Sequence, residues 1–180
     1  MPTNLLDSIN SVLAPDLLGN AASLLGEPPV ATGKAVSATI PVILGGLVRN
    51  AGDSNLMSQV LAMLKSPVND GSVLRNPELI LDAASGRPGG VTDLGNAFLS
   101  TLFGGRLRTV TDAIAQYAGI RSGSSGSLLT MLAPVVLGTL GQRAQRDNLD
   151  LGGFTRLLAD QKESVAGALP AALSSVIGFG

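Results

Sequence analysis

The chain contains neither cysteine nor histidine, and aromatic residues make up only 3% of its 180 residues. Without cysteine there are no disulfides, thiol nucleophiles or cysteine metal sites. Without histidine the commonest general base and metal ligand are missing. The 12 basic and 13 acidic residues leave a formal net charge of -1, so no overall field attracts nucleic acid or anionic lipid. We therefore expect no enzymatic activity, no cofactor and no metal.

Long apolar runs are also missing. No stretch reaches the roughly 18 to 20 uninterrupted apolar residues that cross a bilayer. The start of the chain, from Met1 to Asp7, lacks the basic flank and apolar core of a secretory signal. We expect a cytoplasmic protein, with membrane association only through sequence beyond residue 180.

What remains is an aliphatic composition with many helix breakers. Hydrophobic residues form 45% of the chain, so the core must be built from leucine, valine, isoleucine and alanine. The 23 glycines and 10 prolines work against long uninterrupted helices. The composition favours an all-α fold of many helices.

An internal repeat organises the chain. The segment Ile40–Leu47 returns 93 positions later as Ala133–Leu140, which aligns Pro41 with Pro134. The register extends upstream without a gap and aligns Gly26 with Gly119, and downstream it aligns Ala51 with Ala144 and Asn55 with Asn148. A repeat at a fixed offset predicts two copies of one structural unit. We expect a multihelical fold of two pseudo-symmetric copies related by a rotation near two-fold, with Pro41 overlying Pro134.

Helix signals within the copies refine this prediction. A long helix is expected from Thr32 to Arg49, and a short one from Leu56 to Leu64 capped by Asn55. Pro41 and Pro134 lie inside the long helices and predict a kink in each. The predicted boundaries are 1–65 for the first copy, 66–93 for a linker with a short helix beginning at Asn76-Pro77-Glu78, 94–160 for the second copy, and 161–180 for a C-terminal helix running from Gln161 to Ile177. The whole is expected to form one compact domain.

Glycines in the long helices are the candidate contact residues. Gly45, Gly46 and Gly138 stand inside predicted helices, where a missing side chain lets another helix approach closely. Such an approach serves either packing within the chain or a surface for self-association. We take these three glycines as candidate self-association residues.

A second candidate site has the pattern of a DNA-binding motif. The stretch Ala115–Ile120, followed by Ser122, resembles a helix-turn-helix. However, the would-be recognition helix has no arginine or lysine from Ser122 to Gln142 and has an apolar face. Nucleic-acid contacts around residues 106–132 would have to come from residues outside that helix, namely Arg106, Arg108 and Arg121.

The second copy and the tail resemble the YidB-like family of bacterial proteins of unknown function. The resemblance depends on Leu and Gly patterns in Leu102–Arg106, Ala113–Ile120, Leu132–Gly138 and Gly152–Phe154, and on the tail from Gln161 to Pro170. It implies an all-helical fold. In larger members it implies a membrane helix and an envelope domain after this region. It implies no catalytic residues.

These observations favour a non-enzymatic helical interaction or scaffold module that associates with itself, as a homo-oligomer or an open polymer. Two alternatives stay open. One is nucleic-acid binding through the helix-turn-helix-like segment. The other is an apolar-ligand or lipid-binding helical domain, suggested by the apolar composition without aromatic residues. No small-molecule substrate is indicated.

Overall fold

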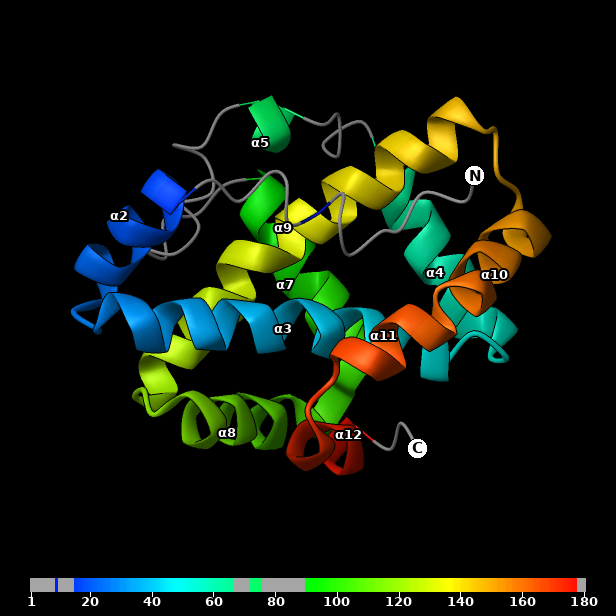
Figure 1. Ribbon diagram of the computed structural model, residues 1–180. Helices are drawn as coiled ribbons and strands as arrows, with labels where there is room; N and C mark the ends of the chain where they lie inside the picture. Colours follow the sequence, from blue (N-terminus) through cyan, green and yellow to red (C-terminus); the bar gives the residue numbers. More distant parts are fainter. Residues whose placement is uncertain (1–8, 10–14, 67–71, 76–89, 178–180) are drawn as a thin grey trace.

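The computed structural model describes residue 9 and residues 15–66, 72–75 and 90–177, and all regular secondary structure in these residues is helical (Figure 1). The predicted all-α fold class is confirmed. The helices are α2 (Pro15–Leu25), α3 (Pro29–Arg49), α4 (Ser54–Leu64), α5 (Ser72–Arg75), α7 (Gly90–Phe103), the 3-10 turn η1 (Gly104–Arg106), α8 (Leu107–Ala118), α9 (Ser122–Arg146), α10 (Leu151–Asp160), α11 (Lys162–Ala168) and α12 (Ala171–Ile177).

The two longest helices, α3 and α9, lie at the centre and pack on each other, and the shorter helices surround them (Figure 1). Both run through their internal proline, Pro41 or Pro134, without a break. Each is long and apolar enough to cross a membrane, but 72% of the most apolar stretch of each is buried inside the structure. In this fold they are the core helices.

A single hydrophobic cluster joins the two copies. Phe98 of α7 and Phe154 of α10 are among its largest fully buried side chains, and aliphatic residues of α3 and α9 fill the space between. No buried side-chain nitrogen or oxygen within the described ranges lacks a hydrogen-bond partner. At the contact between α3 and α8, the Lys34 ammonium lies 4.6 Å from the centre of the Tyr117 ring.

The order of elements follows the repeat. The pairs α2 and α8, α3 and α9, and α4 and α10 occur in the same sequence in the two copies. Gly26 and Gly119 both adopt the left-handed conformation, with φ of 68° and 77°. The near two-fold rotation between the copies stays a prediction.

The ungapped register is wrong after the long helices. The offset of 93 would end α9 at Gln142, but α9 continues for one further turn to Arg146. The short helices that follow are capped by Asp53 and Asp150, which stand 97 residues apart. Asp53, not Asn55, therefore caps α4, because its carboxylate accepts the hydrogen bond from the Leu56 N–H at 3.1 Å.

The predicted C-terminal helix is also corrected. It forms two helices, α11 and α12, separated by Leu169 and Pro170. The proline ring disfavours the helical conformation in the residue before it, and Leu169 is extended, with ψ of 121°. Helix α7 begins at Gly90, so residues 90–93 at the end of the predicted linker are helical. The short helix predicted at Asn76–Glu78 lies outside the described residues.

Candidate functional site

The candidate glycines lie inside the chain's own core. All three, Gly45, Gly46 and Gly138, are buried. A Cβ atom added at Gly45 would lie 2.8 Å from Ile177 Cδ1, and one added at Gly46 would lie 2.9 Å from Phe103 Cε1. The close approach predicted at Gly45 and Gly46 is thus an approach of α12 and α7 to α3 within one chain.

The candidate arginines do not form one basic patch. Arg106 Nη2 donates a hydrogen bond to the Ile177 carbonyl oxygen at 3.4 Å, and Arg121 forms an ion pair with Glu27. Arg108 is exposed on α8. The helix-turn-helix-like segment becomes α8, a turn and α9, but α9 is buried along most of its length, including Leu128–Gly138 except Thr130. The apolar face of this helix is therefore part of the core.

An open hollow of about 940 Å³ lies between η1, α8 and the first turn of α9. Its charged residues are one base and one acid, Arg108 and Asp112, and the rest of its lining is small, polar or aliphatic. The described part of the chain contains no group of acidic side chains that could hold a metal ion. The hollow therefore contains no such metal-binding group, and Arg108 stays protonated, so it cannot serve as a catalytic base beside Asp112.

The most defined surface feature is the turn between α2 and α3, at the left end of Figure 1. The Gly26 N–H donates to the Ser23 carbonyl oxygen at 3.2 Å, and the Glu27 N–H donates to the Ala22 carbonyl oxygen at 3.0 Å. This is the Schellman pattern, which needs a residue with positive φ, and Gly26 supplies it. The C-terminal end of α2 therefore has a fixed shape.

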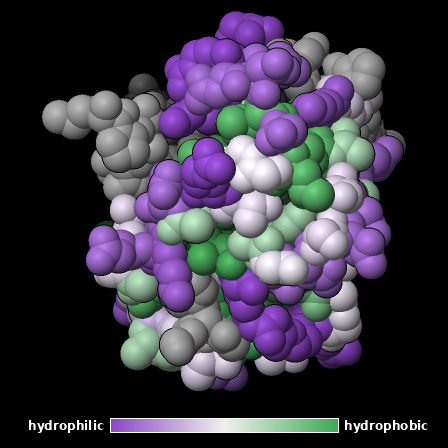
Figure 2. Space-filling view, turned by 90° about the vertical axis from the view of Figure 1, so that its right-hand side faces the viewer, coloured by the Kyte–Doolittle hydropathy of each residue, from purple (hydrophilic) through white to green (hydrophobic). Residues whose placement is uncertain are grey.

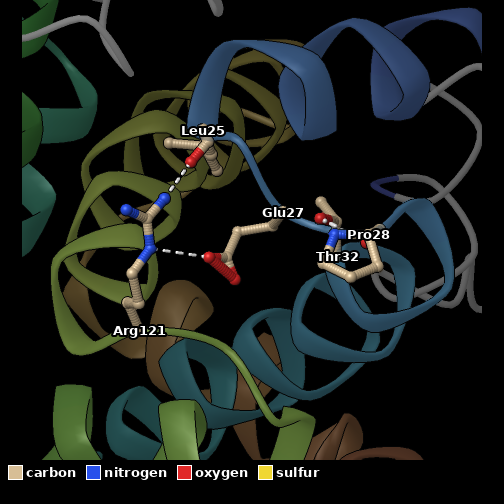
Figure 3. Close-up of polar contacts among 5 residues, drawn as sticks. All are labelled: Leu25, Glu27, Pro28, Thr32 and Arg121. Carbon is tan, nitrogen blue, oxygen red and sulfur yellow. Dashed lines mark hydrogen bonds and ion pairs between the residues drawn. The ribbon is translucent and has the colours of Figure 1, made fainter.

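The start of α3 is fixed as well. Pro29 occupies the first turn, where its preset φ suits a helix and its missing N–H costs nothing. Thr32 Oγ1 donates a hydrogen bond of 3.0 Å to the Pro28 carbonyl oxygen (Figure 3). Two prolines and one hydroxyl thus hold the chain as it enters α3.

The side chain of Arg121, which lies in the turn between α8 and α9, contacts the turn between α2 and α3 and holds it in place. Its Nε lies 2.8 Å from Glu27 Oε1, and its Nη2 donates to the carbonyl oxygen of Leu25 (Figure 3). That carbonyl ends α2, where a cation interacts favourably with the helix dipole. The Arg121 side chain is 68% exposed, so the ion pair adds little stability but fixes the geometry.

This braced turn presents apolar side chains to solvent. Val30 is 86% exposed and Leu24 is 51% exposed, and these two are the exposed large hydrophobic residues of the described structure. Pro28 and Pro29 beside them are also exposed. We call these four residues the α2–α3 tip. At the offset of 93, the corresponding positions carry Tyr117 and the polar or small residues Arg121, Ser122 and Gly123, so the second copy has no such tip.

The α2–α3 tip was missed in the sequence. The signal for it was the position of Val30, which is out of helical phase with the buried residues Thr32, Ala35 and Thr39 of the same helix. An apolar residue out of phase with the core face points to solvent. The exposure of Leu24 could not be read in this way, because Leu25 beside it is half-buried.

At the opposite end of the molecule, α4 and α10 lie side by side. Figure 2 shows this side of the molecule, where apolar areas are visible between polar side chains. The half-buried hydrophobic residues Leu56 and Leu61 of α4 and Leu151 of α10 are packed against the core there. We call the surface of α4 and α10 the α4–α10 face.

The charged groups near the end of α9 interact with neighbours in the sequence. Arg143 Nε lies 2.5 Å from Asp147 Oδ2, one helical turn away. This hydrogen bond, together with the positive charges of Arg143 and Arg146, lowers the pKa of Asp147 below its usual value of 3.8, against a smaller opposing effect of desolvation. The backbone N–H of Asp147 caps the end of α9, and the side-chain pair does not resemble a catalytic group.

Comparison with known proteins gives one match. Neither a curated protein nor a solved structure matches the chain. The family described as bacterial protein of unknown function (DUF937) matches residues 7–143, which include α3, α8 and most of α9. This region covers more than half of the chain and contains the predicted YidB-like motifs up to Gly138. The chain therefore belongs to the DUF937 family of bacterial proteins.

Proposed function

We propose that the protein is a non-enzymatic interaction module that associates with further copies of itself through the α2–α3 tip. The observation that carries the proposal is the exposure of Val30 and Leu24 on a turn that Gly26, two prolines and Arg121 hold in place. Exposed aliphatic residues are common singly, but a group of them on a fixed turn is typical of a contact surface. A fixed turn loses little entropy when it binds, which favours association.

The position of the α2–α3 tip supports a second copy of the chain as the partner. It lies at one end of the molecule, and the partly apolar α4–α10 face lies at the other end (Figures 1 and 2). A contact between two different surfaces of identical chains repeats from copy to copy unless its rotation closes a ring. The proposed assembly is thus head-to-tail, and it grows into an open polymer as concentration rises.

A non-enzymatic role is consistent with the chemistry of the chain. It has no cysteine or histidine, and the hollow beside α8 pairs no acid with a base in a closed site. Among the described residues no three acidic side chains cluster, and Asp53 and Asp150 serve as helix caps. The proposal therefore assigns the surface, and not a pocket, as the functional part of the molecule.

Light scattering coupled to size-exclusion chromatography over a concentration series tests the proposal. The wild-type mass should rise with concentration. Val30→Asp should shift the midpoint of that rise to concentrations about 10-fold to 100-fold higher, since losing a buried valine contact costs roughly 1.5 to 3 kcal/mol. Ser37→Asp, an equally small polar change at an exposed position of the same helix, serves as the control and should behave as wild type. A wild-type protein that stays monomeric at every concentration contradicts the proposal.

A further inference from the structure

The end of the described chain lies in a groove made by the family region. Helices α11 and α12, here called the arm (residues 162–177), pack on α3, and α12 also packs on α8. Gly45 of α3 lies under the arm, and its missing side chain leaves room for Ile177 Cδ1. We call the surface of α3 and α8 that the arm covers the groove. Both α3 and α8 lie within residues 7–143, which the family covers, whereas the arm follows that region.

A single apolar strip attaches the arm. Val165, Leu169, Leu173 and Ile177 recur at every fourth position and are between 0% and 8% exposed. Three of them, Val165, Leu169 and Ile177, have carbon atoms within 3.6 Å of the position that a Gly45 Cβ would occupy. The residues on the other side of the arm are exposed, among them Lys162, Glu163, Ala168, Ala171 and Ala172. The arm thus contacts the molecule on one side, as a separate element does.

The joint between α10 and the arm is a single residue whose backbone angles are close to those of a helix. Only Gln161 separates α10 from α11, and its φ of -88° and ψ of -7° are already in the right-handed helical region. The Val165 N–H donates to the Gln161 carbonyl oxygen at 2.9 Å with helical spacing, while the Gln161 N–H donates to the Leu158 carbonyl oxygen at 3.0 Å with the spacing of a tighter turn. Extending the i to i−4 hydrogen-bond pattern through Gln161 would join α10 and α11 into one helix of roughly 27 Å. We take this straightening as the movement that releases the arm from α3.

We propose that the groove around Gly45 is a docking site for the arm of a second copy of this chain, so that two molecules exchange arms. The occupant is defined by the structure itself, because the groove is shaped to the strip of Val165, Leu169, Leu173 and Ile177. An exchanged arm makes the same contacts as the arm in its own groove, so exchange costs little once the joint has straightened. The inference rests on the proposed self-association and gives it a second contact, separate from the α2–α3 tip.

A complementation experiment tests the exchange. One variant, Gly45→Leu, has a blocked groove and an intact arm. The other, Leu173→Asp with Ile177→Asp, has a disabled arm and an open groove. Both also carry Val30→Asp, which removes the tip contact. Each variant alone should be monomeric by light scattering, and an equimolar mixture should give a 1:1 heterodimer of twice the mass. A mixture that remains monomeric while both variants keep their far-ultraviolet helical signal overturns the exchange.

A second measurement covers variants that fail to fold. The chain has no cysteine, so single cysteines can be introduced at exposed positions, Ala172→Cys on α12 and Thr109→Cys on α8, in separate molecules with Val30→Asp. With donor dye on one and acceptor dye on the other, exchange predicts energy transfer that develops slowly after mixing. Absence of transfer overturns the exchange. Failure of the tip contact gives a different experimental result. In that case Val30→Asp leaves the assembly of the otherwise wild-type protein unchanged.

Discussion

Replacing Gly46 with alanine should destabilise the protein, whereas replacing Gly33 with alanine in the same helix should stabilise it. Both changes gain about 0.5 to 1 kcal/mol because alanine favours the helix over glycine. At Gly33 the new methyl group meets nothing within 4 Å. At Gly46 it would lie 2.9 Å from Phe103 Cε1 and 3.2 Å from the branched Cγ atom of Leu102. Both partners are buried, so neither can move aside freely.

Both variants gain the same helix preference. The difference between their free energies of unfolding therefore measures the cost of the close contact at Gly46. Overpacking a core costs typically about 1 to 3 kcal/mol. For a chain of this size, 1 kcal/mol shifts the melting temperature by about 2 to 4 °C, so Gly46→Ala should melt roughly 3 to 9 °C below Gly33→Ala. Thermal unfolding followed by circular dichroism measures both. If Gly46→Ala melts as high as Gly33→Ala, the packing of α7 on α3 is not as described.

Other parts of the structure give further expected outcomes. Asp150→Ala removes the 2.8 Å bond to the Gly153 N–H and should lower stability by about 1 kcal/mol in urea unfolding. Asp147 has a lowered pKa, so its contribution to the free energy of unfolding is present above pH 3.8 and is lost as pH falls through the folded-state pKa. In Asp147→Asn the free energy of unfolding, measured in urea, should depend less on pH over that acidic range. Arg121→Ala should weaken self-association in the light-scattering series although it removes no apolar surface, because the tip loses its brace, and a wild-type midpoint would contradict this role.

Much of the fold could be predicted from the sequence. The aliphatic composition predicted a core of leucine, valine, isoleucine and alanine, and the repeat of Pro41 at Pro134 predicted two copies of one helical unit. These features act locally, through backbone conformation and helical periodicity, so a sequence reveals them. The extra turn of α9 was not predictable in this way, since the matching residues Ala144 and Asn148 kept the apparent register through it.

The candidate site was less accessible to sequence reasoning. A glycine within a helix indicates close approach but not which element approaches, and the partner of Gly45 proved to be Ile177, 132 residues away in the chain. Likewise, the pairing of Arg121 with Glu27 depends on how the two copies meet. Val30 is an exception, because its position out of phase with the buried residues of its helix indicates exposure from the sequence alone. Contacts between distant segments are set by packing, and a single sequence records them only faintly.

The contact between Lys34 and Tyr117 has a spectroscopic consequence. Tyr117 is the only tyrosine and the chain has no tryptophan, so its intrinsic emission at tyrosine wavelengths arises at one place, where α3 meets α8. That place lies on the two helices that also form the groove around Gly45. Emission intensity and accessibility to a soluble quencher therefore report, without any label, on whether α3 and α8 keep their distance.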